Sequence, residues 1–231
     1  MAHALVSGAN RGLGLEFVRQ LLARGRRVIA ACRQPGKAIE LTRLAGEHPG
    51  HLMVLPLLLP ETRSIAELAR TVEAMDLHVD LLINNAGLSI AGERFGTVEI
   101  EGLRSAFGAN AAGPLLLTQA LAPSFVDAAR VVNITSELGS IAQTTSVYTP
   151  SYAISKAALN MATRLLSIAL AEQGGTVVVA LSPGWARTDM GGDNAPLSVQ
   201  ASVAAMLRVI DGLGQADNGK FLSHDGAELP W

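Results

Sequence analysis

Short apolar runs alternate with stretches of helical periodicity along most of the chain. The runs of strand length occupy residues 2–7, 27–32, 51–57, 80–84, 130–134 and 177–181. Apolar residues recur at helical spacing in residues 15–22, 37–47, 64–75, 101–121, 151–172 and 198–211. A short continuous apolar run predicts a buried strand, whereas apolar residues three and four positions apart predict one face of a helix. The chain therefore predicts strands and helices in regular alternation.

This alternation indicates how the elements are connected. A helix between two strands makes a crossover that leaves the strands parallel, and such helices cover both faces of the sheet. We therefore predict an α/β fold with a doubly wound, mainly parallel sheet. The length of 231 residues fits one domain of this class, and the sequence shows no linker, internal repeat or low-complexity segment.

Composition and charge narrow the classes of partner. Hydrophobic residues make up 49% of the chain and charged residues 16%, which favours a packed core over disorder. The net charge of −2 gives no reason to expect a nucleic acid or an anionic membrane surface as a partner. No stretch approaches the roughly 18 apolar residues of a membrane span.

Cysteine and histidine usage bears on the compartment and on metal binding. Cys32 has no partner for an internal disulfide, and Met1 leads into the first apolar run without the charged leader of a secretory signal. Both observations predict a cytoplasmic protein. The five histidines lie far apart without the spacing of metal ligands, so we predict no metal site.

A glycine-rich turn follows the first predicted strand. Gly8, Gly12 and Gly14 lie between the apolar run of residues 2–7 and the first helical stretch. In a strand, turn and helix of this kind, backbone N–H groups and the helix N-terminus converge on a phosphate. The position of the motif at the start of the chain predicts nucleotide binding. A tight turn that binds nothing is the alternative.

Two arginines near this turn indicate which nucleotide is bound. Arg33 follows the second strand, close to where an NAD-binding protein places an acid on the ribose 2′-hydroxyl. An arginine there suits a 2′-phosphate, and Arg11 adds a second cation on the same side, with no acid nearby. The two arginines predict NADP. The alternative for Arg33 is a solvated charge at the end of a strand.

The helical stretch of residues 151–172 places a phenol beside an ammonium group. Tyr152 and Lys156 are four positions apart and therefore share one face of a helix. A neighbouring positive charge favours the phenolate, so we expect Lys156 to lower the pKa of Tyr152. Taken alone, such a pair is more often a solvated lysine near a half-buried tyrosine.

Two further polar residues occupy positions where chemistry is expected. Ser136 lies just beyond the fifth predicted strand, and ligands of open parallel sheets bind at the carboxyl ends of the strands. Asn110 lies among small residues within the stretch 101–121, where a buried amide needs partners and can reshape the helix around a water. The alternatives are a serine that satisfies a local turn and an asparagine that faces solvent.

These residues belong to a longer set of motifs that occurs in a fixed order. The set comprises residues 7–14, Asn84-Asn85-Ala86-Gly87, Asn110, Ser136, Tyr152 with Lys156, and Pro183-Gly184. In this order the motifs resemble the short-chain dehydrogenase/reductase family of the Rossmann type. Residues 31–33, 184–192 and 221–231 resemble most its branch of carbonyl reductases, C-factor and Sniffer-like proteins. The resemblance implies a single Rossmann domain over residues 1–231, with a seven-stranded sheet that carries both the cofactor and the substrate sites.

The resemblance also implies a role for each of four central residues. Tyr152 would be the acid that protonates a carbonyl oxygen, or the base in the reverse reaction. Ser136 would hydrogen-bond the substrate oxygen, and Lys156 would hold the ribose hydroxyls on the nicotinamide side. Asn110 would hold a water that links Lys156 to solvent. The implied activity is that of an NADP-dependent oxidoreductase acting on a small-molecule carbonyl or alcohol.

The implied cofactor is NADP (NADPH). Its site would be lined by Gly8, Asn10, Arg11, Gly12, Leu13, Arg33, Asn85, Ala86, Gly87, Tyr152, Lys156, Pro183, Gly184 and Thr188. The chain departs from the family at Leu58 or Leu59, where the family usually has an aspartate that binds the adenine amino group. A leucine side chain accepts no hydrogen bond, which puts adenine recognition and cofactor affinity in doubt.

Less specific features bear on the substrate and the assembly. The substrate pocket is expected to include Leu138, Val147, Trp185 and Met190, with Leu88 and Ile141 beside them. Apolar walls and a short loop after Gly184 favour small apolar aldehydes or ketones, with core packing as the alternative for each wall residue.

The family commonly dimerises through helices such as 101–121 and 151–172, so we expect a homodimer, with a homotetramer as the alternative. A dinucleotide-binding regulatory protein of the C-factor type, with little turnover, is the second functional hypothesis.

Overall fold

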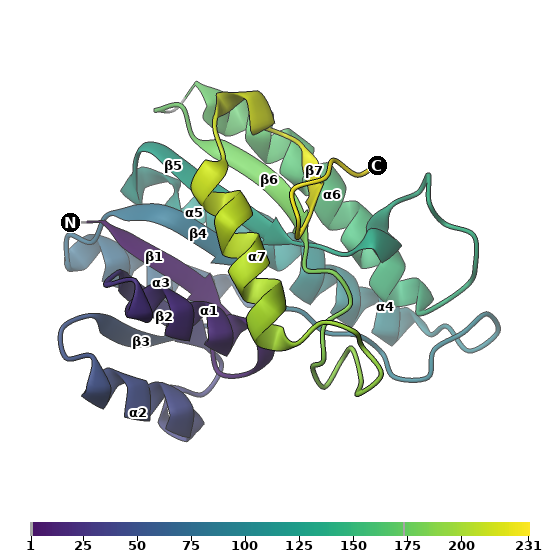
Figure 1. Cartoon of the computed structure of the whole chain (residues 1–231), viewed down its shortest axis with the longest axis horizontal. Helices are drawn as coiled ribbons and strands as arrows, with labels where there is room; N and C mark the ends of the chain where they lie inside the picture. The colour runs from purple at the N-terminus through teal and green to yellow at the C-terminus, as the bar shows by residue number, and fades with distance from the viewer. Residues whose placement is uncertain (1, 173) are drawn as a thin grey trace.

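The computed structural model describes residues 2–172 and 174–231, so residues 1 and 173 of the predicted domain lie outside the described residues. The described residues form a sheet of seven parallel strands in the order β3-β2-β1-β4-β5-β6-β7 (Figure 1). The strands are β1 (His3–Ser7), β2 (Arg27–Cys32), β3 (Leu52–Pro56), β4 (Val79–Asn84), β5 (Phe125–Ile134), β6 (Val177–Ser182) and β7 (Phe221–Ser223). The predicted doubly wound architecture of the Rossmann type is confirmed, and the sheet is parallel throughout.

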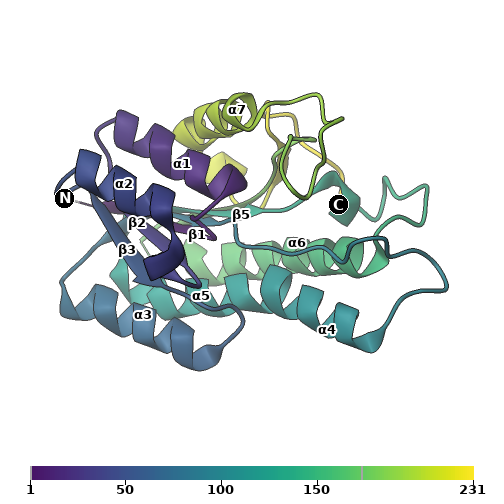
Figure 2. The same cartoon turned by 90° about the horizontal axis from the view of Figure 1, so that it is seen from below.

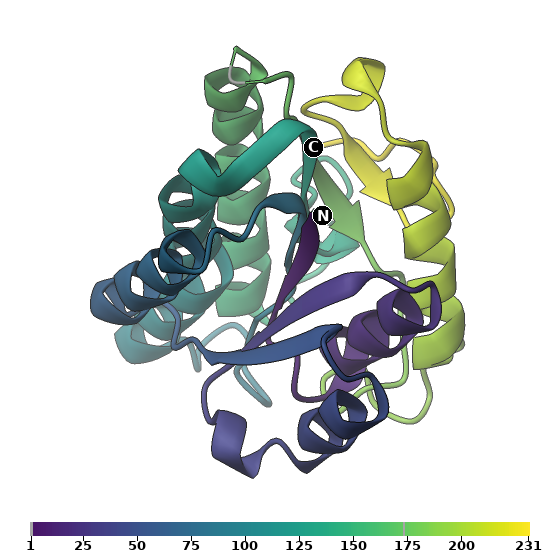
Figure 3. The same ribbon diagram turned by 90° about the vertical axis from the view of Figure 1, so that its left-hand side faces the viewer.

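Helices cover both faces of the sheet (Figures 2 and 3). One face carries α1 (Gly12–Ala23), α2 (Ile39–Glu47) and α7 (Val199–Gly212). The other side carries α3 (Thr62–Ala74), α4 (Ile100–Phe107), α5 (Gly113–Leu121) and α6 (Pro150–Ala171). Shorter turns are η1 (Pro35–Lys37), η3 (Ala122–Ser124), η4 (Glu137–Gly139) and η5 (Gln215–Asp217), and η2 (Gly108–Ala112) is a π-helix.

Neighbouring residues of the central strands pack into two different cores. On β1, Ala4 and Val6 pack against residues of α1 and α7, whereas Leu5 packs with residues of α3, α5 and α6. A strand that is buried on both faces needs no polar position, and its sequence is a continuous apolar run. This burial explains why the chain shows apolar runs instead of alternating apolar and polar residues.

The order of the strands indicates where a sheet of this class binds its ligands. The chain adds β2 and β3 on one side of β1, and then adds β4 to β7 on the other side. In doubly wound sheets, ligands bind outside the carboxyl ends of the strands at the point where this order reverses. The segments 88–99, 140–149 and 185–197 all project from this end of the molecule (Figure 2).

The helical stretch predicted over residues 101–121 forms α4, the π-helix η2 and α5 in succession. The apolar periodicity continues through the wider turn, and the reshaping expected around a buried Asn110 is the π-helix, which contains this residue. Both junctions pack closely on the loop after β3. A Cβ atom on Gly108 would lie 2.9 Å from Cγ of Pro60, and one on Gly113 would lie 3.0 Å from Cβ of Leu59.

An alanine at Gly14 tests the close packing of the glycine-rich turn. A Cβ atom on Gly14 would overlap the carbonyl oxygen of Gly8 and lie 2.5 Å from Nδ2 of Asn85. We expect Gly14→Ala to lower the free energy of unfolding by about 1 to 3 kcal/mol, since such overlap forces the backbone to shift.

The matched control is Gly46→Ala in α2. Gly46 is exposed, and no atom lies within 4 Å of the position of its Cβ atom. Here alanine should raise the free energy of unfolding by up to about 1 kcal/mol through helix propensity. Urea unfolding of both variants measures the contrast, and effects of the same sign and size would contradict the packing described for Gly14.

Candidate active site

The glycine-rich turn after β1 depends on glycine for its conformation and for its packing. Gly8 and Gly12 have φ values of +65° and +54°, in the left-handed region that favours glycine. A Cβ atom on Gly8 would lie 2.8 Å from Cα of Ala86 in the loop after β4. The turn therefore adopts this shape, and meets the neighbouring loop, because these positions carry no side chain.

The N-terminus of α1 is open to an anion. Its N-cap residue, Arg11, makes no side-chain capping hydrogen bond, and the first turn contains no acidic residue. The first N–H groups of a helix have no partners within the helix, and the helix dipole favours a negative charge beside them. The backbone cradle of Gly8 and Gly12 next to these donors fits the diphosphate of a dinucleotide. Asn10 and Leu13 belong to the same turn and the first residues of α1.

Arg11 has an acidic partner that the sequence did not indicate. Its guanidinium forms an ion pair with Asp189, which lies 178 positions further along the chain in the loop after β6. The expectation that no acid lies near the two arginines is therefore wrong for Arg11, because the fold brings the loops after β1 and β6 to the same edge. Both partners are largely exposed, so the pair contributes at most about 1 kcal/mol. Arg33 is exposed just beyond the end of β2.

The loop after β4 braces the glycine-rich turn. The Nδ2 group of Asn85 donates hydrogen bonds to the carbonyl oxygens of Ser7 (3.0 Å) and Gly8 (3.3 Å). The backbone N–H groups of Asn85 and Ala86 donate to Oγ of Ser7. The amide donors of Asn85 are thus engaged within the protein, where they hold the shape of the turn. Asn84 lies deeper and donates to Oγ1 of Thr118 and to Oδ1 of Asn133.

Helix α6 carries Tyr152 and Lys156 together, as their spacing predicts. The helix begins at Pro150, whose fixed φ and missing N–H suit the first turn of a helix. The Nζ atom of Lys156 lies 5.6 Å from the centroid of the Tyr152 ring. It donates a hydrogen bond of 2.7 Å to the carbonyl oxygen of Ile134, at the end of β5. The lysine therefore joins α6 to the central sheet.

Burial sets the pKa values of both side chains. Lys156 is only 4% exposed, and burial lowers the pKa of its ammonium group to about 7. Burial raises the pKa of Tyr152 to about 12, and a hydrogen bond with the Ser136 side chain offsets only part of the rise. The expected lowering of the Tyr152 pKa by Lys156 is not seen in this structure, because the cost of desolvating the phenolate outweighs the other effects.

Ser136 lies between β5 and η4, next to Tyr152. Its Oγ atom accepts a hydrogen bond of 3.2 Å from the backbone N–H of Leu138, and its side chain lies close enough to Tyr152 to lower the pKa of the phenol. Ser136 also has the turn-capping role that was the alternative to chemistry, so the two roles coexist. The structure brings Ser136, Tyr152 and Lys156 together at the carboxyl edge of the sheet.

Asn110 is fully buried in the π-helix and is bonded on two sides. Its Nδ2 group donates hydrogen bonds of 2.8 Å to the carbonyl oxygen of Leu88 and to Oγ of Ser155, and its Oδ1 atom accepts one of 2.8 Å from the N–H of Leu88. The side chain ties the loop after β4 to α6. A Cβ atom on Gly87 would lie 3.2 Å from Oδ1 of Asn110 and 3.7 Å from Nζ of Lys156, so Gly87 lies between these two residues.

A buried carboxylate close to Tyr152 was not indicated by the sequence. Glu93, in the loop after β4, accepts hydrogen bonds of 2.6 Å from the backbone N–H and from Oγ of Ser151. Thr149, the N-cap residue of α6, makes no side-chain capping hydrogen bond, so Glu93 supplies this cap from a distant segment. A carboxylate at the N-terminus of a helix is stabilised by the helix dipole. The separation of 58 positions leaves no local signal in the sequence.

The loop after β6 lies opposite the glycine-rich turn. It begins with Pro183 and Gly184, and Gly184 has a φ of +67°. A Cβ atom on Gly12 would lie 3.8 Å from Cγ2 of Thr188 in this loop. Together with the ion pair between Arg11 and Asp189, this approach places the two loops on facing sides of the predicted cofactor site.

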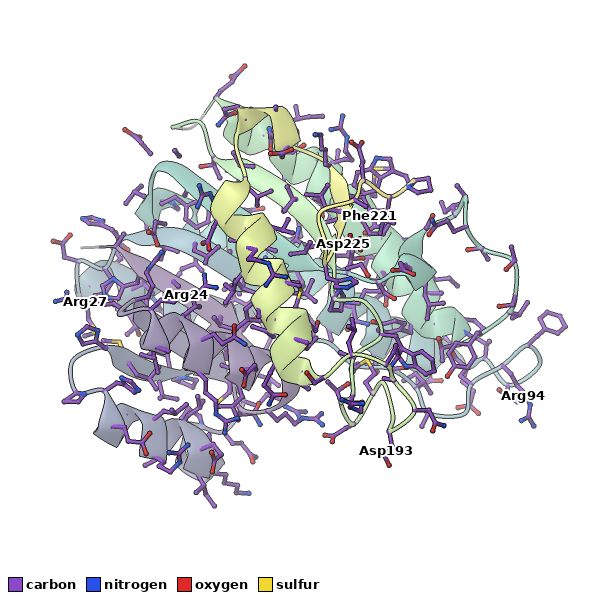
Figure 4. The ribbon with its side chains drawn as sticks, viewed as in Figure 1. Arg24, Arg27, Arg94, Asp193, Phe221 and Asp225 are labelled. Atoms are coloured by element: carbon purple, nitrogen blue, oxygen red, sulfur yellow. The ribbon has the colours of Figure 1, made fainter. Side chains whose placement is uncertain are left out.

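The residues expected to wall the substrate pocket are exposed. The exposed fraction is 40% for Leu138, 63% for Val147, 57% for Trp185 and 51% for Met190. Core packing, the alternative for these side chains, is therefore excluded. Nε1 of Trp185 donates a hydrogen bond of 2.8 Å to the carbonyl oxygen of Gly191, which fixes the loop after β6. Figure 4 shows Asp193 at the outer end of this loop and Arg94 near the tip of the loop after β4.

The side chain of Leu58 has no hydrogen-bonding group, unlike the aspartate that is usual here in the resembled family. Its side chain is 43% exposed beyond the end of β3. Its backbone N–H donates a hydrogen bond of 2.9 Å to Oγ of Ser64, and its carbonyl oxygen accepts one of 3.0 Å from the N–H of Glu61. The backbone polar groups of Leu58 are therefore both bonded within the protein.

Within the described ranges, no helix is long and apolar enough to cross a membrane. In the same part of the chain, no group of three or more His, Cys, Asp or Glu side chains is placed to hold a metal ion. The free thiol of Cys32 is buried at the end of β2.

Comparisons with known proteins agree with this geometry. The family described as short chain dehydrogenase matches residues 2–196. C-signal of Myxococcus xanthus is 46% identical to this chain over 155 residues, which cover 66% of this chain and 93% of C-signal.

Two solved structures are similar over the full length. The NADPH-bound carbonyl reductase from chicken fatty liver is 37% identical, with a TM-score of 0.92, and the match covers 100% of this chain and 98% of that chain. Carbonyl reductase Sniffer of D. melanogaster is 33% identical, with a TM-score of 0.94, and the match covers 100% of both chains. These similarities support an oxidoreductase with a nicotinamide cofactor.

The buried Lys156 predicts a pH-dependent stability. Its pKa is about 7 in the folded protein, against an ordinary value of 10.5, so between these values the unfolded chain binds more protons than the folded protein. The free energy of unfolding should therefore rise with pH in this window, by at most about 1.4 kcal/mol per unit. Below pH 7 both states are protonated and the cost of burial is constant.

Lys156→Met removes this contribution. In urea unfolding between pH 7 and 9, we expect the wild type to gain stability relative to Lys156→Met. The window ends below the range in which Tyr152, with its pKa raised to about 12, produces the opposite slope. Parallel curves for the two proteins would show that Lys156 keeps its ordinary pKa in the folded state.

Proposed function

Since this chain belongs to the short-chain dehydrogenase family, we propose that it is an NADPH-dependent carbonyl reductase acting on small apolar aldehydes or ketones. The observation that carries the proposal is the contact of Ser136 with Tyr152 at the carboxyl edge of the sheet, with Lys156 buried beside the tyrosine ring. We further propose that residues 1–231 are one domain with both sites. The lone, buried thiol of Cys32 supports a cytoplasmic location.

Tyr152 is suited to be the proton donor of a reduction. With a pKa raised to about 12, its phenol is protonated at neutral pH. We propose that it gives this proton to the substrate carbonyl oxygen, and that NADPH, when bound, supplies the hydride. Ser136 would hydrogen-bond the same oxygen, an interaction that strengthens as negative charge develops there. In the reverse direction the phenolate of Tyr152 would take the proton back.

Lys156 is proposed to stabilise the site after the proton has left. A phenolate at Tyr152 favours the ammonium form of Lys156, whose Nζ atom lies 5.6 Å from the ring centroid. The lysine would also hold the ribose hydroxyls of the cofactor. Asn110 is proposed to hold the water that returns a proton to this pair. Because its Nδ2 group is bonded to Leu88 and Ser155, that water would use the free lone pair of Oδ1 or the backbone.

Arg33 and Arg11 are proposed to select NADPH through the 2′-phosphate. Arg33 is exposed at the end of β2 and is available to a ligand. Arg11 shares its charge with Asp189, so we assign the larger part of phosphate recognition to Arg33. With Leu58 in place of the usual aspartate, cofactor affinity depends more on phosphate contacts than on contacts with adenine.

The remaining cofactor contacts follow the geometry of the two facing loops. Backbone groups of Gly8 to Leu13 are proposed to bind the diphosphate, and Ala86 and Gly87 to line the adenine ribose beside Asn85. Pro183, Gly184 and Thr188 are proposed to meet the nicotinamide, since their loop faces the glycine-rich turn. The exposed apolar rim of Leu138, Val147, Trp185 and Met190 is proposed to receive the substrate.

An apolar stripe on α6 is proposed as the interface of a homodimer. Ile154, Met161, Leu165 and Ile168 are exposed by 55%, 62%, 56% and 64%. Their spacing places them along one side of the helix, and exposed apolar patches of this kind mark interaction surfaces. Sedimentation velocity separates the proposed dimer from the alternative tetramer, and a monomer at micromolar concentration would overturn both.

The similarity to C-signal keeps a second candidate function, a regulatory protein that binds the dinucleotide and turns over little. Such a protein needs the glycine-rich turn but has no need of Ser136 and Lys156 beside Tyr152. The assembled side chains therefore favour the enzyme.

Oxidation of NADPH with a panel of simple aldehydes, ketones and quinones tests the proposal. We expect the wild type to turn over, and Tyr152→Phe to lose at least about 100-fold in kcat, because phenylalanine keeps the ring but has no proton to give. The matched control is Tyr148→Phe, since Tyr148 is 64% exposed in the segment before α6 and should be dispensable. Tight NADPH binding with no turnover of any compound would favour the regulatory candidate.

A second prediction concerns the choice of cofactor. We expect Arg33→Ala to weaken NADPH binding at least about tenfold and to leave NADH binding within about twofold, because only NADPH carries the 2′-phosphate that pairs with arginine. Fluorescence titration measures both dissociation constants. Arg24→Ala is the control, since Arg24 lies at the far end of α1 (Figure 4). There its guanidinium pairs with Asp211. Equal losses for NADPH and NADH would refute the assignment of Arg33.

A further inference from the structure

The face of α6 that carries Tyr152 and Lys156 continues to a third polar residue. Asn160 follows Lys156 by four positions, so the three side chains share one side of the helix. Asn160 is only 4% exposed. A buried amide needs hydrogen-bond partners, and the positions of these partners show which segments the amide connects.

Asn160 is bonded at both ends of its amide group. Its Oδ1 atom accepts a hydrogen bond of 2.7 Å from Oγ1 of Thr135, which is itself 1% exposed. Its Nδ2 group donates one of 3.1 Å to the carbonyl oxygen of Gly139. Both partners lie outside α6, at the end of β5 and in the turn η4.

These two partners stand on either side of Ser136. Thr135 precedes the serine directly, and Gly139 closes the turn η4 that follows it. Within the turn, the N–H of Gly139 donates a hydrogen bond of 2.9 Å to the carbonyl oxygen of Ser136. The N–H of Leu138 donates one of 3.2 Å to Oγ of Ser136. One amide group on α6 therefore holds both ends of the short segment that presents the Ser136 hydroxyl.

Lys156 adds a third attachment of the same segment to the same helix. Its Nζ atom donates to the carbonyl oxygen of Ile134, two residues before Ser136. The backbone of Gly139 also packs directly on α6, since a Cβ atom there would lie 2.8 Å from the carbonyl carbon of Lys156. Segment 134–139 is thus fixed to the helix that carries Tyr152 at two places. Lys156 lies about one helical turn beyond the tyrosine, and Asn160 about two turns beyond it.

We propose that Asn160 is a positioning residue, which sets the hydroxyl of Ser136 at hydrogen-bond distance from Tyr152 and from the substrate oxygen. The assignment of its effect on catalysis rests on the proposed reductase function. Asn160 does not touch substrate or cofactor in this account, and it acts through Ser136. Its loss leaves the carbonyl oxygen of Gly139 and the hydroxyl of Thr135 without their partner and frees the turn.

The proposal predicts a specific pattern of kinetics for Asn160→Ala. A small displacement of a positioned group can cost about 100-fold in rate, so we expect kcat to fall about 10-fold to 100-fold. The dissociation constant of NADPH should stay within about twofold. In the background of Ser136→Ala, the same substitution at Asn160 should change kcat by less than about threefold, because the group that it positions is already absent.

A matched control separates this role from general stability. Asn218 is also bonded at both ends of its amide. Its Oδ1 atom accepts a hydrogen bond of 2.9 Å from the N–H of Val178, and its Nδ2 group donates one of 2.9 Å to the carbonyl oxygen of Ser167. It lies in the segment between η5 and β7, away from Ser136. Asn218→Ala should lower stability in the way that Asn160→Ala does, and should leave kcat within about twofold.

A structural readout keeps the proposal testable without turnover. We expect amide hydrogen exchange, measured by mass spectrometry on peptides that cover residues 134–144, to become at least about tenfold faster in Asn160→Ala and to stay unchanged in Asn218→Ala. If Asn160→Ala does not fold, Thr135→Val serves in its place, because it keeps the shape of the side chain and removes only the donor to Asn160. A smaller change in the same direction is then expected.

The outcomes separate this inference from the proposed function. Faster exchange in segment 134–144, together with loss of kcat that disappears in the Ser136→Ala background, supports the positioning role. Losses of kcat that add independently of Ser136, or exchange that matches the wild type, overturn it. If the wild type reduces no compound of the panel, the proposed function fails, and the exchange experiment alone decides whether Asn160 holds the turn.

Discussion

The burial of Lys156 is the constraint on which the arrangement of the site depends. An ammonium group that is 4% exposed needs a strong acceptor, and it finds the carbonyl oxygen of Ile134 at the end of β5. To reach that atom, α6 must lie close against the carboxyl ends of the strands, which the absence of a side chain at Gly139 permits. The same approach brings Tyr152 to Ser136. One costly buried charge and one helix therefore determine the geometry of the proposed proton donor.

The sequence predicted those features that repeat at short range. Strands buried on both faces produced continuous apolar runs, and the helix period placed Tyr152 beside Lys156; the motif order predicted the family, which the comparisons confirm. Contacts between distant segments could not be predicted, because no local pattern encodes them. The ion pair of Arg11 with Asp189 joins residues 178 positions apart, and the cap that Glu93 places on α6 joins residues 58 positions apart. The pKa of Tyr152 also depends on burial, which spacing alone does not give.

The two loops that face each other at the carboxyl edge connect the proposed cofactor site with the proposed substrate site. Arg11 belongs to the turn that fits the diphosphate, and its partner Asp189 lies in the loop that carries Trp185 and Met190. Under the proposed function, a cofactor phosphate that attracts Arg11 would therefore compete with Asp189 for the guanidinium group. This shared charge explains why Arg33, which lies outside that contact, is the better candidate to distinguish NADPH from NADH.

The proposed reaction delivers hydride from NADPH and a proton from Tyr152 to one carbonyl group. It is tested with NADPH that carries deuterium at the transferred position, by mass spectrometry of the alcohol formed from a simple aldehyde. We expect one deuterium on the carbinol carbon with the wild type, and at least about 100-fold slower formation of the labelled alcohol with Tyr152→Phe. Labelled alcohol formed equally well by Tyr152→Phe, or bound NADPH whose deuterium reaches no carbonyl compound, would contradict it.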